Sequence, residues 1–169
     1  MRRSILISAI ALLIVGVGVA EHRSQAMTFD TGRRPQAMRV ADVVQGVEGI
    51  QTWTKLMELG GIDGYKSPQT LFVPSDAAFS AIPTSELKEL LSPDSGDLRR
   101  AFLARGATDS RLSPTQISGR RISVNTLDGR PLTIDATGEE VMVGDAEVLD
   151  IRTLPDGKVM FVIDHALVR

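Results

Sequence analysis

The sequence contains no cysteine and only two histidines, His22 and His165. Without cysteine, no disulfide can hold the fold together. A zinc site built from nitrogen and sulfur ligands is excluded for the same reason, and the acidic residues are not spaced as in a calcium loop. We therefore expect no bound metal and no cofactor, and we expect stability to come from a packed apolar core.

The chain also lacks an excess of positive charge, because its formal net charge at pH 7 is −2 over 169 residues. Nucleic acids and anionic membranes are bound through basic surfaces, so this composition argues against a nucleic-acid partner. Arginines do recur between residues 99 and 121. We expect them on solvated loops and helix ends, with binding of an acidic sugar or phospholipid as the alternative. They are Arg99, Arg100, Arg105, Arg111, Arg120 and Arg121.

One long apolar run is present, from Ile5 to Ala20. Positive residues precede it and a short polar stretch ending in Ala26 follows it, which is the pattern of a secretory signal peptide. We predict a cleaved signal over 1–26, with an uncleaved N-terminal membrane anchor as the alternative. The protein is thus expected to be secreted or periplasmic, or else anchored facing outside the cytoplasm.

Residues 27–38 show little apolar periodicity, so we predict a flexible leader there and a single domain over 39–169. Apolar residues in the first half of that domain recur at helical spacing. The pattern predicts helices around 40–57, with a break near Gly49, over 84–91 and over 98–105. Their expected ends are Gly60-Gly61, Ser92-Pro93 and Gly106.

From Ile117 onward the apolar period changes to two, as expected for strands. Asp128-Gly129, Thr137–Glu139 and Asp156-Gly157 are turn sequences between the alternating segments. Because a helical half precedes a strand-rich half, the sequence predicts an α+β fold rather than parallel βαβ units.

Residues 70–79, with the sequence TLFVPSDAAF, combine a strand with a helix start. The apolar residues at the beginning have strand propensity, and Pro74 ends the strand because proline supplies no N–H to a sheet. Ser75 is a typical helix N-cap, and Asp76 in the first turn is expected to serve the start of the same helix. We expect Phe79 to pack in the core.

This segment resembles the first signature of the fasciclin (FAS1) domain family. Further similarities follow in the family's order: Leu56–Ile62 resembles its first helix, Thr126–Gly129 its central hairpin, and segments within 141–167 its second signature. The resemblance covers about residues 39–168. The residues taken as its structural signature are Phe72, Pro74, Asp76, Phe79, Gly129, Ile163, Asp164 and His165.

The resemblance implies a wedge of short β-strands packed with a helical layer formed mainly by the N-terminal half. It also implies a non-enzymatic role in extracellular adhesion, through binding to a cell-surface or matrix protein, a sugar or a lipid. Two histidines that members often carry are absent: residues 102–106 contain none, and Phe161 stands at the second position. A carrier of a small apolar ligand, such as a lipid held between helices and sheet, is the alternative function.

Asp150-Ile151 is the candidate contact site, because the resemblance implies that an Asp-Ile pair at this position serves recognition in some relatives. The competing interpretation places Ile151 in the core and gives Asp150 a local bond to the backbone. Asp164-His165 suggests acid–base chemistry, but no nucleophile motif accompanies the pair, and adjacent strand residues point to opposite faces. We therefore predict no catalytic residue.

Overall fold

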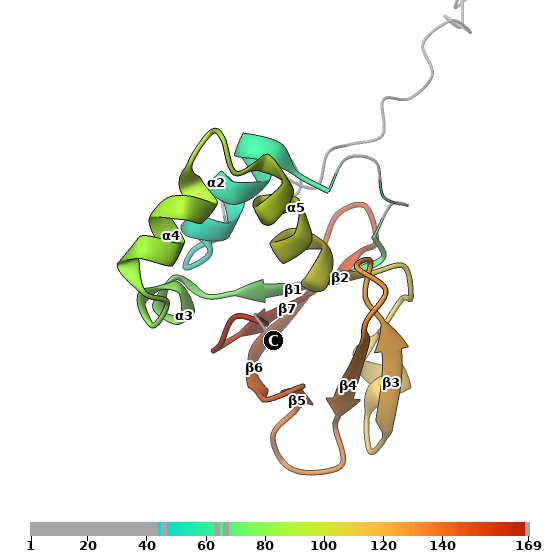
Figure 1. The fold of residues 1–169 in the computed structure, drawn as a ribbon. Helices are drawn as coiled ribbons and strands as arrows, with labels where there is room; N and C mark the ends of the chain where they lie inside the picture. Colours follow the sequence, from blue (N-terminus) through green and yellow to red (C-terminus); the bar gives the residue numbers. More distant parts are fainter. Residues whose placement is uncertain (1–43, 45–46, 63–64, 66–67, 168–169) are drawn as a thin grey trace, which may run out of the picture. The chain divides into compact units, whose positions relative to one another are not determined.

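The structure is a computed structural model that describes residue 44 and residues 47–62, 65 and 68–167. All of them belong to one unit, residues 37–169. The predictions for the signal segment, the leader and the first apolar residues of the domain lie outside the described residues. Helices and strands carry the labels of Figure 1.

Helices dominate the first half of this unit and strands the second, which confirms the predicted α+β fold (Figure 1). The helices are α2 (Gln51–Gly60), α3 (Asp76–Ser80), α4 (Thr84–Leu91), α5 (Gly96–Arg105) and α6 (Pro114–Ile117). The strands are β1 (Thr70–Pro74), β2 (Ala107–Thr108), β3 (Arg121–Asn125), β4 (Pro131–Asp135), β5 (Met142–Val143), β6 (Ala146–Thr153) and β7 (Val159–Ile163).

The differences between predicted and observed elements are local. Helix α4 has the predicted bounds, and α5 ends before Gly106 as predicted. Ile117, however, ends the short helix α6, because Ser113 and Gln116 form a capping box that starts a helical turn there. Strand alternation begins only at Arg121. Strand β2 has no counterpart in the prediction, since two residues are too few to show a period.

The seven strands of the described part form one sheet in the order β2-β1-β7-β6-β5-β4-β3. Strands β1 and β7 pair in parallel, with Phe72 opposite Phe161, and each of the other neighbouring pairs is antiparallel. All residues of β1 and β7 are buried, as expected for strands that are covered on both faces.

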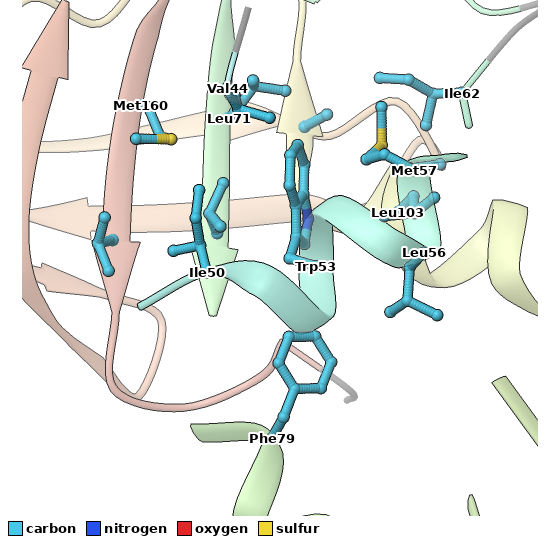
Figure 2. Close-up of a cluster of buried hydrophobic side chains, with 14 of the residues drawn as sticks. Val44, Ile50, Trp53, Leu56, Met57, Ile62, Leu71, Phe79, Leu103 and Met160 are labelled. Atoms are coloured by element: carbon cyan, nitrogen blue, oxygen red, sulfur yellow. The ribbon is translucent and has the colours of Figure 1, made fainter. Parts of the chain in front are cut away.

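The two faces of β1 and β7 contact two separate apolar cores, because successive side chains of a strand alternate. Leu71 and Met160 point towards the helices, where Figure 2 shows them in one cluster with Trp53 and Phe79. The intervening side chains point the other way, into a second core shared with the β3–β5 strands and α6. Its most buried members are Phe72, Ile117, Ile134, Val143, Ala146, Val159, Phe161 and Ile163.

The segment at 70–79 connects strand β1 to two helices. Ser75 caps α3 as predicted, since its Oγ accepts the N–H of Ala78 at 3.1 Å. Asp76 lies in the first turn of α3, but its carboxylate bonds a different helix. Oδ1 accepts the N–H of Thr52 at 2.8 Å and Oδ2 that of Gln51 at 3.1 Å. The expectation that Asp76 serves its own helix therefore missed its main contact, the N-terminus of α2.

Candidate functional site

Strand β6 carries Asp150 and Ile151, and only its first residues have partners on both sides. Strand β7 pairs along residues 148–153, whereas β5 pairs only with Ala146 and Glu147. The N–H of Val148 donates to the carbonyl of Val141, which precedes β5. Beyond Val148, no described backbone group pairs with the outer side of residues 150–153. The second half of β6 is therefore an edge within the part of the chain that the structure describes.

A β-bulge at Leu149 precedes this edge, as the register shift between Val148 and Asp150 shows. Leu149 is 54% exposed. The next charged residues form an ion pair along the strand, with Asp150 Oδ2 at 2.5 Å from Arg152 Nε and the side chains 44% and 47% exposed. The edge thus presents an apolar side chain and two opposite charges to the surroundings.

The two residues of the predicted contact site have different roles in the fold. Ile151 lies opposite Phe161 and packs against the second core, where it is half-buried. The competing interpretation expected Asp150 to bond the local backbone, but its carboxylate instead accepts a hydrogen bond from the Arg152 side chain. Ile151 therefore helps to anchor the strand, whereas Asp150 is available at the surface.

Asp164 and His165 follow strand β7, and their side chains meet, with Asp164 Oδ1 at 2.8 Å from His165 Nδ1. The prediction that they point to opposite faces is wrong, because the strand has already ended at Ile163. Asp164 Oδ1 also accepts the N–H of Glu147 at 2.7 Å, which ties the end of β7 to the start of β6.

This contact shifts both pKa values. Burial by itself would raise the pKa of Asp164, but the hydrogen bonds from His165 and Glu147 outweigh burial and lower it. The hydrogen bond to Asp164 and the charge of its carboxylate raise the pKa of His165. The two side chains thus form an ion pair when the imidazole is protonated, and the link to β6 is the separate bond from Glu147 to Asp164.

His165 also lines a cleft of about 330 Å³ beside helices α3 and α4. Glu86 and Asp145 share this cleft with it, and none of the described residues that line it carries a hydroxyl or a thiol. Glu86 also lines a second cleft of about 220 Å³, with Leu98 and Phe102 among its walls. Charged groups interrupt the walls of both clefts, so neither has the continuous apolar lining that the carrier hypothesis requires.

Within the described residues, no group of three or more histidine, aspartate or glutamate side chains is placed to hold a metal ion. The same part of the chain contains no helix with the length and apolar character needed to cross a bilayer.

Comparison with known proteins agrees with this fold. The profile of the fasciclin domain matches residues 48–169. The chain belongs to the fasciclin domain family. Among solved structures, a FAS1 domain pair from the insect cell adhesion molecule Fasciclin I superposes with a TM-score of 0.63 at 18% identity, over 78% of this chain and 51% of that chain. This likeness shows that the chain has the FAS1 fold.

Curated relatives of this fasciclin domain are bacterial. Protein sll1483 of Synechocystis is 23% identical, over 94% of this chain and 89% of its own length. Immunogenic protein MPB70 of Mycobacterium bovis is 31% identical, over 63% of this chain and 53% of its own length. Immunogenic protein MPT70 of Mycobacterium tuberculosis matches to the same extent. The match thus spans about half of each mycobacterial protein.

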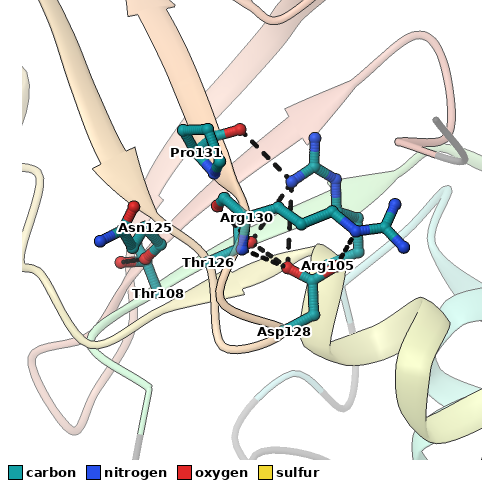
Figure 3. A network of polar contacts seen from close by, with 7 residues as sticks. All are labelled: Arg105, Thr108, Asn125, Thr126, Asp128, Arg130 and Pro131. Carbon is teal, nitrogen blue, oxygen red and sulfur yellow. Dashed lines mark hydrogen bonds and ion pairs between the residues drawn. The ribbon is translucent and has the colours of Figure 1, made fainter.

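Arg105, the last residue of α5, stands in the segment 102–106 that lacks the histidine frequent in the fasciclin family, and its side chain is largely buried (Figure 3). Its Nη1 lies 3.9 Å from Asp128 Oδ1 and donates to Thr126 Oγ1 and to the carbonyl of Pro131, both at 3.4 Å. With the Arg105 side chain only 13% exposed, the expectation of a solvated arginine is wrong here. The network holds the hairpin at Gly129, whose φ is +83°, against the end of α5.

The expectation that the arginines of this fasciclin domain are solvated is also wrong for Arg99, which is only 3% exposed. Its guanidinium donates to the carbonyls of Leu90, Ser92 and Leu59 at 3.0, 2.9 and 3.2 Å. These carbonyls lie at the C-terminal ends of α4 and α2, where a positive charge is favourable. A Cβ at Gly60 would lie 3.3 Å from Arg99 Nε and Nη2, so the glycine at the end of α2 leaves room for this guanidinium.

Proposed function

We propose that this fasciclin-family protein is an exported, non-enzymatic binding module for adhesion or surface association, and that the second half of β6 is its contact edge. The observation that carries the proposal is a strand edge without a described partner, combined with an exposed leucine and a half-exposed ion pair over residues 149–152. Such an edge can accept an extended segment of another molecule, because its N–H and C=O groups supply backbone hydrogen bonds.

The chemistry of the edge favours a protein as the partner over a sugar or a lipid. Backbone bonds along the edge would provide affinity, and contacts with Leu149 and Asp150 would provide specificity. We propose a cell-surface or matrix protein, because only a polypeptide supplies the matching ladder of donors and acceptors. The predicted signal over 1–26 supports a secreted or periplasmic location, or an outward-facing anchor if the signal is retained.

A role without turnover draws support from the chemistry around His165. The imidazole contacts Asp164, and Asp145 and Glu86 line the same cleft, but none of the described residues of its wall offers a hydroxyl or a thiol to activate. We propose that Asp164 joins the end of β7 to the start of β6, that His165 supports the Asp164 carboxylate, and that the two residues do not act on a substrate.

The test of the contact edge is retention of the purified protein by immobilised cell-envelope extract, with mass spectrometry of the molecules that it binds. Asp150→Ala should weaken retention while the circular dichroism spectrum stays unchanged, since this exposed acid contributes little to the fold. Asp97→Ala is the matched control, because Asp97 is also an exposed acid paired with an arginine, but on α5. If the two variants are retained equally, the second half of β6 is not the contact edge.

The test of the non-enzymatic role uses His165→Ala. We expect this variant to behave as the wild type in any assay of turnover on envelope components. A turnover that the wild type performs and His165→Ala abolishes would contradict the proposal.

A further inference from the structure

At two residues of β6, Ile151 and Thr153, the backbone N–H and C=O groups point away from β7. Val159 lies opposite Thr153 and donates its N–H to Gln69 on the far side of β7, so Thr153 and Val159 form a non-hydrogen-bonded pair. Hydrogen-bonded and non-hydrogen-bonded pairs alternate along an antiparallel ladder. Ile151 is two residues from Thr153, so its pair with Phe161 is also of the non-hydrogen-bonded kind. The N–H and C=O groups of Ile151 and Thr153 therefore point outward from the edge.

The charges on either side of Ile151 make this edge complementary to itself. Asp150 and Arg152 lie on the same face of β6, because they are two residues apart in the strand. If two β6 strands pair antiparallel about Ile151, Asp150 of each copy lies directly opposite Arg152 of the other. These residues fall in non-hydrogen-bonded pairs, in which side chains across a ladder come closest and opposite charges stabilise the pairing.

We propose that the partner at this edge is a second copy of the chain, which pairs β6 with β6 about a two-fold axis at Ile151. The two Ile151 residues exchange N–H···O=C bonds, and the charges of the two Asp150–Arg152 pairs alternate in sign around the axis. This inference rests on the proposed function, because it takes the second half of β6 as the contact edge. It adds the identity of the molecule that binds there.

The edge at β3 provides a contrast within the same sheet. Strand β3 forms one end of the sheet, and Arg121 is the only charged residue among its five. No antiparallel pairing of β3 with itself therefore places opposite charges across the ladder. A charged residue on an edge of this kind deters association, whereas the balanced pair on β6 permits it in one register.

The geometry also sets the expected strength of the dimer. The paired segment is short, so the buried area is small and the association should be weak. Leu149 adds an exposed apolar side chain near the end of the pairing, towards Thr153 of the other copy. A weak dimer of this kind forms where the local concentration is high, as it is for protein gathered on a surface.

The test is sedimentation velocity of the protein purified after expression of the full chain, over micromolar to millimolar concentrations. We expect a reversible equilibrium between monomer and dimer. Asp150→Arg and Arg152→Asp each place like charges opposite each other twice, and each should lower the association constant at least ~10-fold. The double variant D150R/R152D restores alternating charges and should dimerise as the wild type does.

An equimolar mixture of the two single variants is the sharpest arm of this test. One variant carries two arginines around Ile151 and the other carries two aspartates, so the mixture should form a heterodimer although neither variant dimerises alone. Circular dichroism checks that each variant is folded. A wild type that stays monomeric at the highest concentration overturns the inference, and so does a mixture of folded variants that forms no heterodimer.

The failure of this inference is distinguishable from failure of the proposed function. Retention by envelope extract is measured at a dilution at which the wild type is monomeric. If Asp150→Ala loses retention and no dimer is found, the contact edge stands and the second copy is rejected. If the dimer forms and retention is unaffected by Asp150→Ala, the second copy stands and the envelope partner is rejected.

Discussion

Thr52 donates its backbone N–H to Asp76 Oδ1 at 2.8 Å, although 24 positions separate the two residues. The second carboxylate oxygen accepts the N–H of Gln51, and the N–H of Asp76 itself donates to the carbonyl of Gly49 at 2.8 Å. Ile50, at the N-cap of α2, has no side-chain acceptor to offer. Asp76 therefore performs the N-cap function for α2 from the start of a neighbouring helix, which joins the two helices.

Asp76→Ala should lower the free energy of unfolding by about 1–2 kcal/mol, because it leaves two N–H groups at the start of α2 without their acceptor. Asp76→Asn should cost less, since the amide oxygen can still accept one of these bonds. Urea denaturation measures both effects, and Asp97→Ala on α5 is the control for the loss of an exposed acid. Equal midpoints for Asp76→Ala and Asp97→Ala would show that the cap contributes nothing.

Phe79→Ala should lower the free energy of unfolding by about 3–5 kcal/mol, because the ring is buried in the first core and its removal leaves a cavity. The ring packs against Phe102, with the two centroids 5.9 Å apart. Leu149→Ala is the control for an exposed apolar side chain and should change stability by less than about 0.5 kcal/mol. Chemical denaturation at low protein concentration compares the two variants.

The parts of the fold that the sequence predicts are those with local signals. The bounds of α4 follow from leucine spacing and from the Ser92-Pro93 stop, and the hairpin at Gly129 follows from its Asp-Gly turn. The Ser75 cap is equally local, because its partner is three residues away. The family resemblance then placed these elements together in the α+β FAS1 fold.

The interactions that the sequence did not predict join residues distant in the chain. The carboxylate of Asp76 reaches α2, and Arg99 reaches the end of α2 across 40 positions. Contacts between residues so far apart in the chain produce no local sequence pattern. Arg99 did have one sequence signal: it lies four residues before the buried Leu103, which places it on the inner face of α5. The contact between Asp164 and His165 was missed because it depended on where β7 ends, the kind of boundary that periodicity locates poorly.

Acid should destabilise the protein in part through Asp76. Its pKa in the folded protein is lowered, because the hydrogen bonds from Thr52 and Gln51 outweigh the opposing effect of burial. Its contribution to stability is therefore complete above the unfolded-state pKa of about 4 and is lost as the pH falls through the folded-state pKa. We expect the urea midpoint to drop below about pH 4, and Asp76→Asn should flatten this drop, with Asp97→Asn as the control for the loss of an exposed acid.

Arg99 and Gly60 should be energetically coupled, because the guanidinium occupies the space into which a Cβ at Gly60 would project. Arg99→Ala should lower the free energy of unfolding by about 3 kcal/mol or more, since three helix-end carbonyls lose a charged donor. Gly60→Ala should destabilise the wild type. In the Arg99→Ala background the same change should stabilise by up to about 1 kcal/mol, because alanine is the better helix former once the space is free.

A double-mutant cycle on urea midpoints measures this coupling. Gly96→Ala is the matched control, because Gly96 is also a helix-end glycine, but a Cβ there would meet nothing within 4 Å. We expect its effect to be the same with and without Arg99. If Gly60→Ala changes the free energy of unfolding equally in the wild type and in the Arg99→Ala background, the two residues are not coupled. The space that Gly60 leaves would then not matter for the guanidinium.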